Sequence, residues 1–465
     1  RVLSLHVAAV TGLLALPVHA QQEQPAAQSL EEVVVTARRR AESVQDVPLA
    51  IDTLGLDQIN QFNIQTTEDV ARVTPALTFD VGALPNDTRP VIRGVNAARG
   101  RPNVAILVDF IDVSSESMTV AGGGVTANLR LLDLERVEVV KGPQSVLYGR
   151  SAFSGAVNYI TRRPSQEFEG RVNADFNEHS TYDLGLSLSG PLIRDRLAGR
   201  LTLSSYSTDG WYDNPNTGDE LGSGDSDGAA VALQWTPTDT FTAYLRAEYS
   251  EDEFTPRAAA FVRSISHNFD PAVNYLGTGT VTDNATQLPY DFNGTVCDGI
   301  DRQQPYFDSF GAGPACRPVV TGELNGKEKD IDLSPDPRTG RDFDGSETDN
   351  TRVHLDLTWE LDTLSLRYLM GYTDNELSMQ QDFDMSNYDI LAFPPMASQF
   401  GFSAMSQQQV DTEQWSHELR VSADYDRWRW SASALYWDED MDVAFDDEWW
   451  LREGADQQLV LDLLN

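Results

Sequence analysis

The chain has 465 residues, of which 72 are Asp or Glu and 34 are Lys or Arg, giving a net charge of −38. This charge disfavours a nucleic-acid partner, because phosphate binding needs clustered Lys and Arg. The 40% apolar content argues against disorder, and the longest apolar run falls short of the ~20 residues of a spanning helix. The acidic excess lies almost entirely after residue 165, so we expect two differently built parts.

Residues 1–20 have the pattern of a secretory signal. An apolar run over residues 7–16 is followed by Val18-His19-Ala20, a small-residue cleavage site. The alternative is a buried N-terminal helix. The absence of an initial Met leads us to expect that the sequence begins inside the signal. Export also permits a disulfide between Cys297 and Cys316 in an oxidising compartment, the alternative being two free thiols.

Residues 21–45 are predicted to form an extended arm. Three consecutive valines favour an extended backbone in the segment Glu31, Glu32, Val33, Val34, Val35, Thr36 and Ala37. A free strand offers unpaired N–H and C=O groups to the sheet edge of another protein. The alternative is an ordinary first strand of the following domain.

Residues 46–165 show a mixed α/β pattern. We expect a short helix at 67–72 and short strands at 90–95, 104–109 and 136–140, which together make a compact domain of about 120 residues. Sharp turns are expected at Gly142-Pro143, and Gly149 and Gly155 permit backbone shapes that other residues resist.

After residue 168 apolar and polar residues alternate with a period of two, which predicts β-strands. The nine expected strands are 169–178, 181–190, 197–207, 228–236, 240–250, 350–360, 363–374, 413–424 and 427–438. Short connections at one end of the strands and long loops at the other, with aromatic residues at both ends, are typical of an outer-membrane barrel. A soluble β-sandwich is the alternative.

No pattern in the sequence indicates catalysis. The histidines are scattered, so no metal site and no cofactor are predicted, and Gly122-Gly123-Gly124 lacks the lysine of a phosphate-binding loop. The segment 222–228 is read as an acidic loop that is either solvated or able to hold Ca²⁺ through its carboxylates. We therefore expect a protein that is not an enzyme.

The stretch from Leu134 to Pro164 resembles the longest signature of the plug domain of TonB-dependent outer-membrane receptors. Val91–Val95 and Leu107–Asp109 are similar to two shorter signatures, and Glu31–Ala37 lies where the family has its TonB box. Two positions depart from the family pattern. Lys141 stands where Arg is usual, and Phe110 follows Asp109 where Gly is usual.

The resemblance implies a small α/β plug domain followed by a transmembrane antiparallel β-barrel. Nine strands are far fewer than the ~22 of the large transporters, so a fragment is expected. The plug turns would be Gly94, Gly142, Pro143, Gly149 and Gly155. The charge pairs between plug and barrel would involve Arg93, Lys141 and Arg150, with Glu418 as the first candidate among the wall carboxylates.

The resemblance also implies an energy-coupled importer in the outer membrane of a Gram-negative bacterium, in contact with its lipid. Its partner would be TonB, bound through Glu31–Ala37, and its substrate a small molecule, with a ferric siderophore expected first. The alternatives are an importer of cobalamin or oligosaccharide, and a surface receptor or adhesin that does not transport.

Overall fold

The structure is a computed structural model in which the following residues are described: 34–64, 66–81, 88–95, 101–115, 132–177, 180–256, 278–282, 289–293, 295–297, 316–318, 331, 333–336, 338–382, 402–425 and 427–451. Residues 34–48 and the chain from Leu49 onward form separate units. Each unit is described by itself. The predicted signal and Glu31–Val33 lie outside the described residues.

The first unit holds a minimal strand pair. β1 (Val34–Val35) is antiparallel to β2 (Glu42–Ser43), with Val34 opposite Ser43 and Val35 opposite Glu42. The turn between them is closed by the Arg39 N–H, which donates to the Thr36 carbonyl at 2.7 Å. A 3₁₀ turn, η1 (Val44–Asp46), follows. Two residue pairs are a weak pairing, because even isolated two-stranded hairpins are marginal in water.

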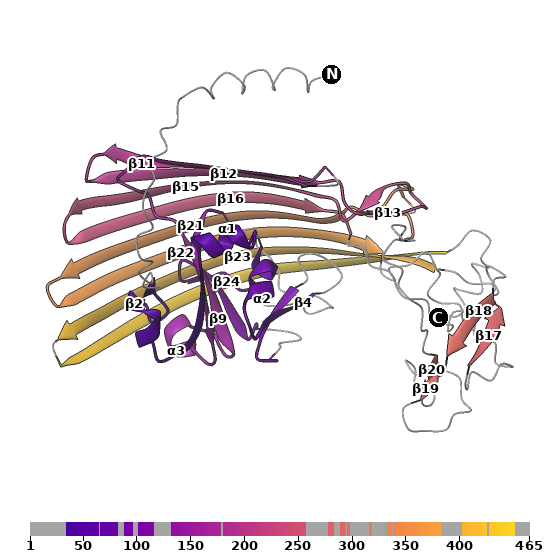
Figure 1. Ribbon diagram of the computed structural model, residues 1–465, viewed down its shortest axis with the longest axis horizontal. Coiled ribbons are helices and arrows are strands. Elements are labelled where there is room, and N and C mark those ends of the chain that lie inside the picture. Colours follow the sequence, from indigo (N-terminus) through magenta and orange to yellow (C-terminus); the bar gives the residue numbers. More distant parts are fainter. Residues whose placement is uncertain are drawn as a thin grey trace, which may run out of the picture. The chain divides into compact units, whose positions relative to one another are not determined.

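The second unit begins with a small mixed domain that we call the plug (Figure 1). Its elements are β3 (Ala50–Gly55), α1 (Leu56–Gln61), α2 (Thr67–Val73), β4 (Leu77–Val81), β5 (Thr88–Ile92), β6 (Val104–Val108), β7 (Ile111–Asp112), β8 (Leu134–Lys141), α3 (Ser145–Tyr148) and β9 (Gly155–Thr161). Five strands form one sheet in the order β3-β8-β9-β6-β7. In this sheet β6 and β9 are parallel and the other neighbours are antiparallel.

The plug core follows from the apolar residues of its central strands. Val137 and Val139 of β8 and Val157 and Tyr159 of β9 are fully buried, and Val70 of α2 packs into the same cluster. α2 starts where the sequence provides a capping box. The Thr66 side chain accepts from the Asp69 N–H at 3.4 Å, and the Asp69 carboxylate accepts from the Thr66 N–H at 3.0 Å.

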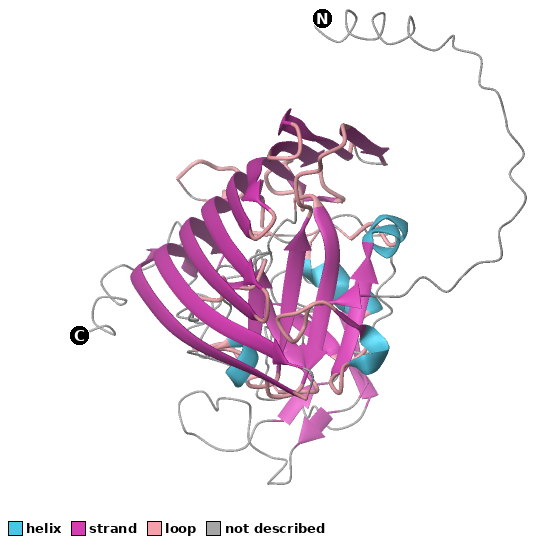
Figure 2. Cartoon of the chain, turned by 90° about the vertical axis from the view of Figure 1, so that its left-hand side faces the viewer, coloured by secondary structure: helices cyan, strands magenta, loops and turns pink. Residues whose placement is uncertain are grey.

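The nine-stranded antiparallel sheet, which we call the wall, is the curved sheet of long strands in Figure 2, and neighbouring strands follow one another in chain order. They are β10 (Glu169–Phe176), β11 (Tyr182–Ile193), β12 (Leu197–Thr208), β15 (Gly224–Thr238), β16 (Phe241–Phe254), β21 (Gly345–Leu361), β22 (Leu364–Asp382), β23 (Phe402–Tyr425) and β24 (Trp428–Leu451). The nine expected strands are therefore confirmed, and most extend further toward the long loops than the alternation predicted.

One such extension corrects the reading of 222–228 as a loop. Gly224–Gly228 begins β15 and pairs with both β12 and β16. Asp225 and Asp227 are exposed on one face, while Ser226 lies on the buried face. The alternation of a strand separates the carboxylates from the intervening Ser, so no loop surrounds a common centre here.

Aromatic side chains form a row at the short-turn ends of the wall. Trp235 and Trp359 both pack edge-to-face against Phe241, each with ring centroids 6.2 Å apart. Exposed aromatics of this kind suit the boundary between lipid and water. None of the helices in the described residues has the length and apolar character needed to cross a membrane.

Within the described residues, three further strand pairs lie in the long connections. They are formed by β13 (Tyr212–Asp213) with β14 (Glu220–Leu221), β17 (Thr278–Thr282) with β18 (Pro289–Asn293), and β19 (Thr295–Cys297) with β20 (Cys316–Pro318), while β4 pairs with β5 in the plug. Cys297 stands opposite Cys316 in the backbone register. Their side chains are not among those described, so the disulfide stays a prediction.

Candidate functional site: the plug–wall interface

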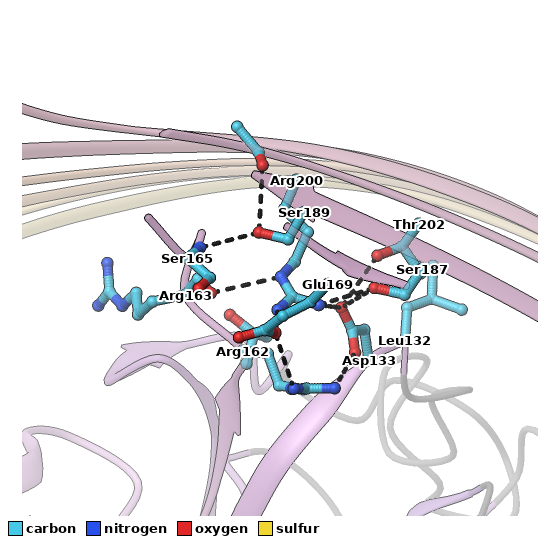
Figure 3. Close-up of polar contacts among 12 residues, drawn as sticks. Leu132, Asp133, Arg162, Arg163, Ser165, Glu169, Ser187, Ser189, Arg200 and Thr202 are labelled. Carbon is cyan, nitrogen blue, oxygen red and sulfur yellow. Dashed lines mark hydrogen bonds and ion pairs between the residues drawn. The ribbon is translucent and has the colours of Figure 1, made fainter. Parts of the chain in front are cut away.

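A buried ion pair joins the plug to the wall. Asp133 precedes β8, and its Oδ2 accepts from Arg200 Nη1 of β12 at 2.9 Å (Figure 3). Both side chains are only 3% exposed. Ser187 and Thr202, on β11 and β12, donate to the same oxygen at 2.9 and 3.1 Å. The carboxylate is thus held by three wall side chains, as a buried charge requires.

Arg200 also holds the chain that connects plug and wall. Its Nε donates to the Arg163 carbonyl at 3.3 Å, and its Nη2 lies 3.2 Å from the Glu169 carboxylate at the start of β10 (Figure 3). Arg162 reaches the same Glu169 oxygen at 3.3 Å and approaches Asp133 at 3.9 Å. One guanidinium therefore connects the last plug segment, the linker and the first wall strands.

A second joint lies at the centre of the wall. Arg163 stacks over the Tyr244 ring of β16, with its Cζ 3.6 Å from the ring centroid, and its Nη2 lies 3.3 Å from Asp356 of β21. Asp356 also accepts from Arg367 of β22 at 2.8 Å. The linker cation thus contacts neighbouring wall strands, with a cation–π contact added to the ion pair.

A third joint uses Arg150, which follows α3. Its Nη2 donates to the Ser114 carbonyl at 3.0 Å and lies 3.5 Å from Glu439 of β24. Its Cζ lies 2.9 Å from the centroid of the Trp437 ring. Gln414 of β23 donates to the same Ser114 carbonyl at 3.2 Å. Arg150, one of the cations singled out in the sequence, therefore reaches a wall carboxylate.

Two carboxylates near the plug turn between β6 and β7 have pKa values shifted in opposite directions: the buried Asp109 in the turn and the half-buried Asp112 in β7. Burial alone would raise the pKa of Asp109, but the His354 imidazole 3.5 Å away, Arg163 and the Thr161 donors outweigh burial and hold that pKa below its usual value. Burial raises the pKa of Asp112, because the Ser114 donors and Arg150, 3.8 Å away, compensate only in part.

Lys141 and Glu418 have partners other than those expected. Lys141 pairs with Asp52 of β3, inside the plug. Lys141 stands opposite Ala50 in the register, so Asp52 is its diagonal neighbour on the same face. Glu418 accepts from Arg420 at 2.9 Å, because residues two apart on a strand share a face. Arg93 is exposed, and no wall carboxylate among the described residues is paired with it.

The predicted turn glycines adopt backbone conformations that favour glycine. The φ angles of Gly94, Gly142 and Gly149 are 76°, 107° and 93°, and Pro143 follows the bend at Gly142. Gly155 has φ 157°, and a Cβ added there would lie 2.4 Å from the Val140 carbonyl oxygen. At Gly155 the close approach of β8 therefore excludes a side chain.

Sequence reasoning missed Asp133, Arg200, Arg163 and Asp356. A partial signal was present, since Arg200 and Asp356 are charged residues on the polar face of apolar-alternating strands. The sequence separation of 67 between Asp133 and Arg200 shows why the partners could not be paired.

At the outer end of the wall, Glu251, Glu253 and Glu347 bring three exposed carboxylates within 4.8 Å of one another, a group that could hold a metal ion.

The site thus consists of a small mixed domain that is seated by buried charges against a wall of antiparallel strands. Residues 43–156 match the TonB-dependent Receptor Plug Domain family. The chain therefore contains a plug domain of the TonB-dependent receptor family. This is a family of receptors and transporters, not of enzymes.

Two curated relatives illustrate the similarity. The pesticin receptor of Yersinia enterocolitica is 28% identical over 240 residues, which are 50% of this chain and 34% of that protein. The ferripyoverdine receptor of Pseudomonas aeruginosa is 28% identical over 159 residues, which are 34% of this chain and 18% of that protein. The chain thus spans about a third or less of the length of these curated relatives.

The fold is also that of a solved structure, BauA, the ferric preacinetobactin receptor of Acinetobacter baumannii. The TM-score is 0.58 at 13% identity, covering 89% of this chain and 50% of that one. At this identity the likeness concerns the fold alone.

Proposed function

We propose that the protein is part of an energy-coupled outer-membrane importer whose substrate is a ferric siderophore. The observation that carries the proposal is the contrast between two kinds of contact. The plug is fixed to the wall through the buried Asp133–Arg200 pair, whereas the arm ahead of it contains a strand pair, β1 with β2, of only two residue pairs. A plug that is anchored in this way, preceded by a strand whose own pairing is this short, suits a device in which force is applied to the arm.

In this proposal TonB binds the segment Glu31–Ala37 by adding a strand. Val34 is 46% exposed, and its pairing with Ser43 is what an incoming strand would replace. Substrate bound on the outer side favours release of the arm only through a difference in its affinity for the two states. The force transmitted along the arm then reaches β3, the first strand of the plug sheet.

The choice of substrate rests on what the relatives are named for. The ferripyoverdine receptor and the ferric preacinetobactin receptor are both receptors of iron chelates. The proposal carries this substrate class over to the present chain and commits to a ferric chelate as the small molecule.

Val34→Pro tests the coupling, because proline removes a strand N–H donor. We expect uptake of a radioactive ferric siderophore by the full-length protein in cells to fall to the level seen with a protonophore, while binding to the same cells stays unchanged. Ser43→Pro is the matched control. Ser43 has φ −63°, which proline adopts, so this variant weakens the β1–β2 pair and keeps the N–H donors of Glu31–Ala37. Ser43→Pro should retain uptake, and wild-type uptake by Val34→Pro would refute the coupling role.

The substrate class is tested separately by the amount of full-length protein in outer membranes from iron-replete and iron-starved cells. We expect a large rise on starvation, followed by energy-dependent uptake of at least one member of a panel of ferric siderophores. An unchanged amount together with no uptake from the panel would refute the iron assignment and leave the coupling result standing.

A further inference from the structure

The turn between β6 and β7 is unusual for its residues. Val108 stands opposite Ile111, so Asp109 and Phe110 form a two-residue hairpin turn, with φ angles of 48° and 75°. Two consecutive positive φ angles normally require Asn, Asp or Gly, because the Cβ of other residues meets the backbone. Asp109 tolerates this conformation, whereas Phe110 is strained by it. Strain of this kind persists where the surroundings impose it.

The surroundings of Phe110 belong to both the plug and the wall. The Phe110 N–H donates to Asn158 Oδ1 of β9 at 3.1 Å, which fixes the turn from within the plug. Phe110 is 8% exposed, and Arg367 of β22 lies over its ring, with Cζ 5.5 Å from the centroid. The ring therefore contributes a contact that a glycine could not make.

The next residue fits a gap in the same wall strand. A Cβ added to Gly371 of β22 would lie 2.4 Å from Ile111 Cγ2 and 3.0 Å from Ile111 Cδ1. Real Cβ atoms essentially never approach another heavy atom this closely, so Ile111 occupies the space that a side chain at position 371 would need. On the other side of the turn, Thr161 Oγ1, which donates to Asp109 at 2.5 Å, lies 3.3 Å from the Tyr244 hydroxyl of β16.

We propose that the turn Asp109–Ile111 docks the plug onto the wall, with Phe110 as the positioning residue. Gly371 and Arg367 of β22 form the surface that receives this turn. The backbone of Phe110 is strained, and the contact that this conformation permits fixes the plug against β22. The inference rests on the proposed function only in that a fixed plug matters for transport, and its test requires neither substrate nor energy.

Phe110→Gly tests whether Phe110 docks the plug or is merely tolerated in a strained turn. The two interpretations predict opposite changes in the rate of hydrogen exchange. Glycine relieves the strain, so without a docking role amide hydrogen exchange of segment 104–113 should become slower. With the docking role we expect exchange of this segment in the full-length protein to become about tenfold faster, since loss of the wall contact lowers its local stability. Unchanged or slower exchange would overturn the proposal.

The wall side supplies a second variant that leaves the plug sequence intact. Gly371→Ala should also accelerate exchange in segment 104–113 by pushing Ile111 out of its place. Gly185→Ala in β11 is the matched control, because its Cβ would come no closer than 3.7 Å to Asn173. Equal hydrogen exchange in the two alanine variants would refute the role of Gly371 in receiving the turn. Uptake is measured independently. If the expected change in hydrogen exchange is absent and uptake is normal, the docking role is refuted and the proposed importer is not.

Discussion

The two halves of the plug are attached in different ways. The first half, residues 50–92, enters the five-stranded sheet through the edge strand β3, whose one partner within the described part of the chain is β8. The second half provides the residues that contact the wall, from Asp109 to Arg163. The arm leads directly into the first half, so force on the arm loads β3 before any wall joint.

The ion pairs that support the two halves differ in burial as well as in number. The Lys141–Asp52 pair that supports β3 has side chains 12% and 33% exposed, whereas Asp133 and Arg200 are both 3% exposed. Solvent screens the first pair, and removing one partner of the second leaves a charge stranded in the interior. The second half should therefore stay on the wall under conditions that release the first.

The largest effect is expected from Arg200→Met. Leaving Asp133 without its cation should cost about 3–5 kcal/mol of local stability. Hydrogen exchange of β8 and β9 amides in the full-length protein measures this as a fall in protection of at least about a hundredfold. Arg194→Met, on an exposed turn of the same wall, is the control and should change little.

A double variant sharpens the interpretation. Asp133→Asn combined with Arg200→Met removes both charges, so its loss of protection should be smaller than the sum of the two single losses. Strictly additive losses of protection would show that Asp133 and Arg200 act independently. That result would contradict the contrast between the two halves of the plug.

A smaller effect, opposite in sign at two neighbouring sites, is expected at Asp109 and Asp112. The pKa of Asp109 is lowered on folding, so its contribution to stability is present above its ordinary value of 3.8 and is lost as the pH falls below it. The pKa of Asp112 is raised, so its ionised form opposes folding at neutral pH and acidification relieves this cost.

At pH 7 Asp109→Asn should therefore lower the protection of segment 104–113, by about 1–3 kcal/mol for lost charged hydrogen bonds. Asp112→Asn should raise the protection and flatten its dependence on pH between 7 and about 4. Exchange measured at several pH values, corrected for the intrinsic rate, checks both signs. The same sign in both variants would contradict the assignment.

The smallest effect is expected from Lys141→Met. Loss of a partly exposed pair should cost about 1 kcal/mol or less. The loss of protection should be confined to β3 and the facing residues of β8, and the amides of β9 should exchange as in the wild type. A fall in protection that spread to β9 would show that the first half is not separately attached.

The sequence by itself determined the elements whose causes are local. The two-residue period placed all nine wall strands, because side chains alternate across a strand whatever the partner. Gly142, Gly149 and Gly155 marked backbone positions with positive φ, because glycine has no Cβ to strain that conformation. The order of motifs around Leu134–Pro164 identified the plug.

The tertiary structure alone decided which charges meet. Lys141 faces Asp52 and not the wall because of the β3–β8 register, and Glu418 faces Arg420 because both project from one side of β23. Asp133 meets Arg200 only once the plug is seated on β12. Such pairs depend on how two separately formed sheets are placed against each other, and no local pattern encodes that placement.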